Sequence, residues 1–488
     1  MRACNATHSS LRGSRPIETQ LQWGGRFESA PDADLLAFGS SLEEDLILAG
    51  FDVDCSRAHV AALQGGGIID EATARTLRAA LAAVRDEIAS GEFAGSARAT
   101  QAEDVHGAID RRVRELAPAA GELLHAGRSR NDQVATTLLL YARDRATQGR
   151  ERCVAIARAT VARAKQALDD GTYLAATTHW QPAQPILLAF WLQAVAENFA
   201  RAARRFERVA HDAAQACPLG SGACSGSTLP LDRGAAAREL GFMGPTRNAL
   251  DAVGDRDVAL DLLHAVVRAL VAASRVSEEC VLYCTPAFGY ARLDDRASTG
   301  SSLMPQKRNP DPFELVRAGA GAANGALAGA LAVTSGIALS YHRDLQETKA
   351  LVIRGTERGL AALRAFERAF SLLGWNAAAM EARAGEGFVV ATDLADALIA
   401  RGVTARRAHE FVGAAVAQAD REGRALDARD LATIGERAGV PNFSAPLDAR
   451  ASIEAKRTSG STNPDAVRLA IGELTSVLDT DFSGAASS

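Results

Sequence analysis

The 488-residue sequence has few aromatic residues and few prolines. Phe, Trp and Tyr make up 5% of the chain, and only 15 residues are proline. Sheets favour aromatic and β-branched side chains, so this scarcity argues against a fold built on strands. Proline is absent from 119 to 181 and from 313 to 440, which leaves room for long helices. The composition therefore predicts an all-α fold.

The sequence also lacks a long apolar run and a strong excess of one charge. No uninterrupted apolar stretch approaches the roughly 20 residues that a bilayer crossing needs. The first twenty residues contain no apolar core of a secretory signal, and we expect a loose extension over residues 1–22. The net charge is −5, with acidic and basic residues interspersed. These features predict a cytoplasmic protein that binds neither membrane nor nucleic acid, and they leave room for an anionic small substrate.

Cysteine gives no sign of a disulfide framework or a metal site. The 7 cysteines are an odd number without CxxC or Cys/His ligand spacing. Cys280 and Cys284 lie one helical turn apart, but no His or carboxylate supports them as ligands. We expect buried free thiols in a reducing compartment and no metal.

Helical spacing of apolar residues is clear in the segment that starts at Asp261. One stripe, broadened by a second set, predicts a helix that is buried on most sides: Leu262, Val266, Leu270 and Ala273, with Leu263, Val267 and Val271. The Ala-rich stretch 316–332 offers small residues that let helices approach closely. No repeat of 20–50 residues is evident, so we expect a bundle of long helices rather than a solenoid.

Four polar, Gly- and Pro-rich islands interrupt the helical pattern, at residues 125–132, 177–185, 218–233 and 298–312. One such island is as often a plain connection as a site. Four islands carrying hydroxyl, amide, imidazole and cationic side chains favour a site assembled at helix ends. Island 218–233 lacks the strand and the Lys of a P-loop, and Ser225 is not in a GxSxG turn, so an anion-binding turn is the remaining functional reading.

The island around GSSLMPQKRNPD is the densest in groups that bind anions. Gly300 can bring backbone N–H groups close to a ligand, and the other candidates are Ser301, Ser302, Lys307, Arg308 and Asn309. Together they would hold a carboxylate or an oxyanion. The Gly and Pro residues also suit a loop that closes over a substrate.

Taken together, these segments resemble the fumarase/aspartase superfamily, for which GSSxMPxKxN is the signature. Other matching segments are similar to its argininosuccinate lyase branch: WGGRF from Trp23, SSLEEDL from Ser40, EDVH from Glu103, AGRSRNDQVAT from Ala126, PLGSGA from Pro218, LDAVGDRD from Leu250, YHRDLQETK from Tyr341 and ATDLADAL from Ala391. The resemblance implies a carbon–nitrogen lyase that splits 2-(N-arginino)succinate into arginine and fumarate by reversible β-elimination. It implies no metal and no organic cofactor.

The resemblance also implies a role for each matched residue. Ser301 is the general base that removes the Cβ proton, and Lys307 and Asn309 hold the carboxylate whose charge grows. His179 assists the leaving nitrogen as general acid, and Glu314 orients or charges it. Substrate binding falls to Ser41, Asp45, His106, Ser129, Arg130, Asn131, Thr178, Arg233, Asn309, Tyr341, Gln346 and Lys349.

The family's architecture implies three helical domains and a homotetramer with active sites shared between chains. The expected boundaries are an N-terminal helical domain at 23–127, a central long-helix bundle at 128–381 with the signature loop 298–312, and a C-terminal helical domain at 382–488. The sequence departs from the family pattern at Cys55, at Trp180 and Pro182, and in the stretch SGSTNPDAV. These departures bear on which amine the enzyme releases.

Two alternatives stay open. One is a related lyase that releases fumarate from another N-substituted aspartate. The other is a crystallin-like structural protein that keeps the fold without turnover, although Ser301, Lys307, His179 and Asn131 are all present.

Overall fold

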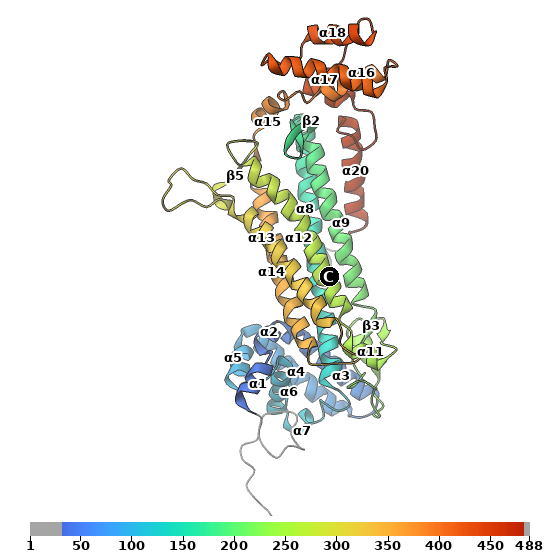
Figure 1. Ribbon diagram of the computed structural model, residues 1–488. Helices are drawn as coiled ribbons and strands as arrows, with labels where there is room; N and C mark the ends of the chain where they lie inside the picture. The colour runs from blue at the N-terminus through green and yellow to red at the C-terminus, as the bar shows by residue number, and fades with distance from the viewer. Residues whose placement is uncertain (1–31, 483–488) are drawn as a thin grey trace, which may run out of the picture. The chain divides into compact units, whose positions relative to one another are not determined.

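The computed structural model describes residues 32–482 (Figure 1). The expected extension at 1–22 and the WGGRF segment lie outside these residues. The described chain consists mostly of helices, with only short two-stranded sheets, so the predicted all-α class is confirmed. No helix within residues 32–482 is long and apolar enough to span a membrane.

The chain forms two compact units. The first contains the residues up to Tyr141, together with Ala214–Asp255 and Ala338–Gln346. The second contains Ala142–Ala213, Arg256–Ile337 and Glu347–Ser488. The long helix α8, Arg130–Asp170, begins in the first unit and continues in the second. The three predicted domains stay a prediction, since this division interleaves segments that are distant in the sequence.

The first unit is a cluster of helices around α3, which packs on α4, α6 and α10. Its elements are α1 (Ala33–Gly39), α2 (Leu42–Asp45), the 3₁₀ turn η1 (Leu46–Leu48), α3 (Ala49–Gly65), α4 (Glu71–Ser90), α5 (Glu92–Ala99), α6 (Val105–Leu116), α7 (Pro118–Gly121), β3 (Ala216–Cys217), α10 (Arg233–Glu239), β4 (Gly244–Pro245) and α11 (Ala249–Gly254). Cys55, Cys217 and Phe242 belong to one of its buried clusters. Small side chains on α3 allow α10 to approach closely.

The second unit contains the long helices. Its elements are β1 (Tyr173–Thr178), β2 (Gln181–Leu187), α9 (Leu188–Asp212), α12 (Asp257–Tyr283), β5 (Ala291–Leu293), η2 (Asp295–Ala297), α13 (Asp311–Thr334), α14 (Leu345–Ser371, whose first residues belong to the first unit), β6 (Leu373–Trp375), α15 (Ala377–Ala384), α16 (Ala391–Ile399), α17 (Ala405–Arg421), α18 (Ala428–Ala438), α19 (Ala449–Ala455) and α20 (Pro464–Thr480). Helix α12 packs along both α13 and α9, which run beside it in Figure 1.

The few aromatic residues gather inside this bundle. The rings of Phe199 and Phe366 stack with centroids 5.3 Å apart, and Phe366 stacks on Phe370 at 5.4 Å. The helix predicted from Asp261 is confirmed as α12, and the stripe residues are buried. The prediction is wrong for Val271, because 39% of its surface is exposed. The helix therefore keeps one solvent-facing edge.

The island at 177–185 differs from the expected irregular connection, because it is part of a hairpin. Strands β1 and β2 pair antiparallel, with Thr178 opposite Gln181. His179 and Trp180 form the two-residue turn between them, at φ +55° and +59°. Positive φ at both turn positions matches the right-handed twist of a hairpin. Asn-Gly is the usual signal for such a turn, and its absence explains why the sequence did not reveal it.

Candidate functional site

The start of helix α8 holds three of the predicted substrate-binding residues, and buried Asp132 organises it. One carboxylate oxygen of Asp132 accepts from the Ser129 N–H at 3.0 Å. The other accepts from the N–H groups of Gly220 and Gly222, at 2.9 and 2.8 Å. Burial raises the pKa of Asp132 to about 6, although these backbone donors oppose the shift. Asp132 thus joins the GRSRND segment to the PLGSGA segment.

Two further side chains hold the PLGSGA segment in place. Asn131 donates its side-chain amide to the Ala223 carbonyl at 3.0 Å. Arg233 donates to the Leu219 carbonyl at 3.1 Å and to the Thr246 hydroxyl at 2.7 Å. Burial lowers the pKa of Arg233. These bonds give Arg233 a structural task in holding the loop, and its predicted contact with substrate stays a prediction.

A second group lies where the chain enters α2. The Ser41 hydroxyl donates to Asp45 Oδ2 at 2.7 Å, and both residues are buried. The Gln346 amide and Arg343 both donate to the Gly39 carbonyl, at 3.2 and 2.6 Å. The structure therefore joins the YHRDLQ segment to Gly39, the residue directly before the SSLEEDL segment, as expected if both segments contribute to one site. Tyr341 is half-buried in the same segment, and Lys349 is buried three residues beyond Gln346 in α14.

His106 lies deeper than a ligand-binding side chain would. It is fully buried, and its Nδ1 lies 2.8 Å from Asp52 Oδ1. Burial alone would raise the pKa of Asp52, but His106, Arg128 and Gln133 outweigh it and lower the pKa to about 2. This geometry favours a supporting role for His106 over direct contact with substrate.

Asp52, Asp132 and Gln133 are not among the site residues predicted from the sequence. Asp132 and Gln133 stand inside the quoted GRSRNDQV motif, so the motif itself was the available signal. Asp52 lies in α3 among residues with no resemblance to a motif, and no sequence signal points to it.

The signature loop in the second unit is closed at its base by a bridge between Thr299 and Asn309. The Asn309 N–H donates to the Thr299 carbonyl at 2.8 Å, and the Thr299 N–H returns the bond at 3.1 Å. Ser301 Oγ accepts from the N–H groups of Leu303 and Met304, at 3.3 and 3.1 Å. Donors aimed at this oxygen would stabilise it as an alkoxide. Lys307 is exposed on the same loop.

The other predicted catalytic residues lie on separate elements. Thr178 and His179 are exposed at the tip of the β1–β2 hairpin. Glu314 is in the first turn of α13 and lies 3.8 Å from Arg317. Among the described residues, no hydrogen bond or ion pair joins His179 to Glu314, Ser301 or Lys307. Within the described chain these groups therefore come from three elements, the β1–β2 hairpin, the signature loop and α13.

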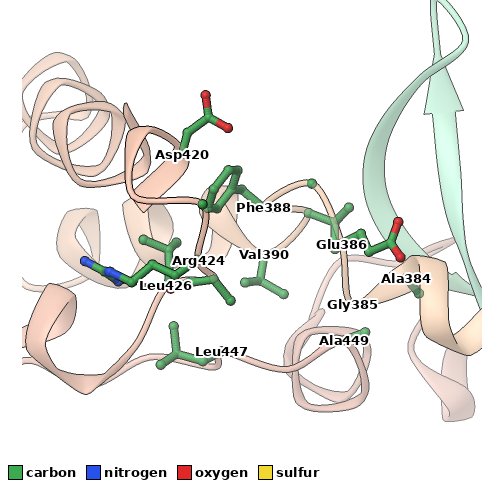
Figure 2. Close-up of a pocket in the computed structure, with 14 residues that line it drawn as sticks. Ala384, Gly385, Glu386, Phe388, Val390, Asp420, Arg424, Leu426, Leu447 and Ala449 are labelled. Carbon is green, nitrogen blue, oxygen red and sulfur yellow. Dashed lines mark hydrogen bonds between the residues drawn. The ribbon is translucent and has the colours of Figure 1, made fainter. Parts of the chain in front are cut away.

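A cavity of about 310 Å³ lies in the C-terminal part of the second unit (Figure 2). Phe388, Val390, Leu426 and Leu447 are among the residues that line it, and Figure 2 shows Arg424 beside Leu426. Arg424 is held by ion pairs to Asp430 and Glu422, each at 2.6 Å. None of the predicted site residues lines this cavity.

Within residues 32–482, no group of three or more His, Cys, Asp or Glu side chains is arranged to hold a metal ion. Cys280 is buried and Cys284 half-buried, and both are free thiols. The expectation of a reaction without metal or cofactor stays a prediction.

Comparison with known proteins identifies the family. Residues 25–325 match the lyase family model, and residues 388–454 match the model for the argininosuccinate lyase C-terminal segment. An argininosuccinate lyase from Anaeromyxobacter sp. (strain K) is 44% identical over 443 residues, which cover 90% of this chain and 93% of the relative. The chain belongs to the argininosuccinate lyase family.

Other relatives place this argininosuccinate lyase family member more widely. The argininosuccinate lyase of Thermus thermophilus is 39% identical over 91% of this chain and 96% of its own length. The crystal structure of EDDS lyase in complex with formate matches with a TM-score of 0.77 and 28% identity, covering 94% of each chain. A class II fumarase from Schistosoma mansoni, at 16% identity and a TM-score of 0.64 over 78% of this chain and 85% of its own, shares the fold alone. The predicted superfamily is confirmed.

Proposed function

We propose that the protein catalyses the reversible β-elimination of 2-(N-arginino)succinate to arginine and fumarate, as a step of arginine biosynthesis. The observation that carries the proposal is the match to argininosuccinate lyases over 90% of the chain. The intact signature loop, with two backbone donors on Ser301 Oγ, supports it. The test is direct: purified protein and argininosuccinate should release fumarate, which is measured by its ultraviolet absorbance.

In this mechanism Ser301 Oγ removes a proton from the carbon beside a substrate carboxylate. The electrons of that C–H bond move onto the carboxylate, which becomes an aci-carboxylate with extra negative charge. Lys307 and Asn309 stabilise this charge with a cation and an amide donor. The alkoxide on Ser301 is unfavourable in water, and the Leu303 and Met304 N–H groups lower its cost.

Collapse of the aci-carboxylate forms the carbon–carbon double bond of fumarate and breaks the bond to the leaving nitrogen. His179 supplies the proton that this nitrogen needs, and Glu314 orients the imidazole. Ser129, Arg130, Asn131 and Thr178 hold the substrate's carboxylates, with Arg130 able to grip one in a bidentate manner. The other binding positions proposed for substrate are Ser41, Asp45, Arg233, Tyr341, Gln346 and Lys349, and His106, predicted from the sequence as a binding residue, supports the site without touching substrate.

A second candidate function is release of fumarate from another N-substituted aspartate. The similarity to EDDS lyase, together with Trp180 and Pro182 at the hairpin tip, favours considering it. Trp180 is 48% exposed beside His179, so it can meet the leaving group. Ranking a panel of succinyl amines by kcat/KM distinguishes the two. A protein that forms fumarate from none of them would instead fit the crystallin-like alternative.

We further propose that the protein works as a cytoplasmic homotetramer with shared active sites. The absence, within residues 32–482, of a hydrogen bond or ion pair from His179 to Ser301 or Glu314 supports completion of the site by other chains. The free cysteines of the described chain support a reducing compartment. Light scattering of the eluted protein should give four times the 51.1 kDa chain mass.

A further inference from the structure

Three helices of the first unit are joined by a circuit of side-chain hydrogen bonds that the backbone of α6 completes between Gly107 and His106. Asp52 comes from α3, Asp104 and His106 from the start of α6, and Arg130 and Gln133 from the start of α8. Asp52 Oδ1 accepts from the Gln133 amide at 2.7 Å and lies 2.8 Å from His106 Nδ1. The buried Asp52 carboxylate thus contacts one side chain from α6 and one from α8.

The orientation of the Gln133 amide is dictated by its two partners. Asp52 is ionised and can only accept, so it takes the amide NH₂ group. The Gln133 carbonyl is therefore turned toward Arg130, whose Nη1 donates to it at 3.0 Å. A guanidinium can only donate, so exchanging the amide's oxygen and nitrogen would spoil both contacts at once. The ionised Asp52 carboxylate thereby determines which way the Gln133 carbonyl faces, and this carbonyl holds Arg130 Nη1 in place.

Asp104 closes the circuit on the other side of the guanidinium. Its Oδ2 accepts from Arg130 Nε at 3.0 Å, and its Oδ1 caps α6 by accepting from the Gly107 N–H at 2.6 Å. The third nitrogen, Nη2, lies so close that a Cβ at Gly107 would be 3.4 Å from it. His106, next to Gly107 in the chain, returns the connection to Asp52.

The guanidinium is the most exposed part of this circuit, and the Asp104 side chain beside it is 14% exposed. The side chain of Arg130 is 28% exposed, whereas those of Asp52 and His106 are 0% exposed. Gln133 is likewise buried, with 1% of its surface exposed. A buried set of polar groups that ends at one exposed cation is arranged to fix the direction in which that cation points.

We propose that Gln133, Asp52 and His106 are positioning residues that hold the Arg130 guanidinium in the orientation that binds a substrate carboxylate. The identity of the carboxylate rests on the proposed function. The positioning role itself applies to any anionic ligand that binds Arg130. With the Gln133 carbonyl removed, Asp104 still holds Nε, and the whole planar guanidinium can pivot about that one bond, away from the ligand.

The first test replaces Gln133 by methionine, which keeps the length of the side chain and removes both polar groups. We expect the KM for argininosuccinate to rise about tenfold, in line with the loss of one hydrogen bond to a charged group. The kcat should stay within about threefold, because Arg130 binds the carboxylate in ground and transition states alike. Gln166→Met is the matched control, since Gln166 is exposed on the same helix and its amide also donates to a carboxylate, Asp170, at 2.8 Å.

The second test exchanges the polarity of the buried pair. Gln133→Glu places a carboxylate against Asp52, and we expect the same rise in KM together with a lower melting temperature. Adding Asp52→Asn to that variant puts an amide NH₂ in place of Oδ1, which can donate both to the introduced carboxylate and to His106 Nδ1 in its acceptor tautomer, and it leaves the other oxygen of residue 133 for Arg130. The double variant should recover KM to within about threefold of wild type, which a merely structural role would not produce.

The outcomes separate this inference from the proposed function. If the unaltered protein releases no fumarate from argininosuccinate, the proposed function is wrong, and calorimetric binding of fumarate then tests the circuit. In either assay, an unchanged affinity in folded Gln133→Met overturns the positioning role. Failure of Asp52→Asn to restore affinity to Gln133→Glu overturns the part played by Asp52.

Discussion

Substitution of Asp132 by asparagine tests whether burial or hydrogen bonding has the larger effect on the pKa of this carboxyl group. Asp132 has 0% exposed surface and accepts from the N–H groups of Ser129, Gly220 and Gly222. Asparagine keeps one acceptor oxygen and turns the other position into a donor that faces a backbone N–H. At acidic pH the carboxyl is protonated and neutral, so the loss comes from the buried amide donor that is left unpaired, and it should lower the free energy of unfolding by about 1–3 kcal/mol.

The size of that loss should depend on pH. The pKa of Asp132 is raised to about 6 from its ordinary 3.8, so the folded state prefers the protonated form. Its favourable contribution is complete below pH 3.8 and is lost as the pH rises through 6. Linkage gives about 2 kcal/mol for this loss between pH 4.5 and pH 7.5 in the wild-type protein. The Asp132→Asn variant has no such titration, so its deficit should shrink by about that amount over this range.

Urea unfolding followed by circular dichroism, on both proteins at pH 4.5 and 7.5, measures this double difference. Taking the difference between the proteins cancels the other titrating groups that they share. A deficit that grows toward pH 7.5 would refute the reasoning, because it would mean that the three N–H donors outweigh burial and lower the pKa. The same two proteins can be compared in the fumarate assay without urea, where a loosened 218–222 loop should raise the KM for argininosuccinate.

Two further predictions concern the signature loop and the bundle core. Ser301→Ala should lower kcat for fumarate release by at least about 100-fold with the fold intact, whereas Ser302→Ala, at the neighbouring hydroxyl, should not; equal effects would remove Ser301 from its role. Gly149→Ala should destabilise the protein by about 1–3 kcal/mol, because its Cβ would lie 2.6 Å from the ring of Phe206. At Gly413 an added Cβ would have no neighbouring atom within 4 Å, so Gly413→Ala should instead stabilise the protein by about 0.5–1 kcal/mol. If both variants changed the melting temperature by the same amount in the same direction, the overpacking argument would be contradicted.

The long helices could be predicted because their signals are local. The absence of proline and the spacing of apolar residues in α12 depend on residues a few positions apart. The hairpin at His179 and Trp180 could not be predicted in the same way, because neither residue is a usual occupant of a turn with φ above zero. The paired strands and the surrounding structure hold these two residues in an unfavourable backbone region.

Contacts within the site also divide into those between residues close in sequence, which could be predicted, and those between distant residues, which could not. In the signature loop, Ser301 meets Leu303 and Met304, and such contacts across two or three residues follow from a compact Ser- and Pro-rich segment. Asp52 instead meets His106 and Gln133, which are 54 and 81 positions away in the chain. Packing of three helices, rather than any local pattern, brings those groups together.

The buried circuit also bears on how far the motif itself can account for substrate binding. Arg130 was predicted from its place in GRSRND, but a motif identifies the cation and not the direction in which it points. That direction depends on Gln133 in the same motif and on Asp52 outside it, because an ionised carboxylate determines which end of the amide meets Arg130. A chain that kept GRSRND and replaced Asp52 by an apolar residue would retain the motif and lose this constraint on the guanidinium. Binding affinity in this family should therefore follow residue 52 together with residue 133.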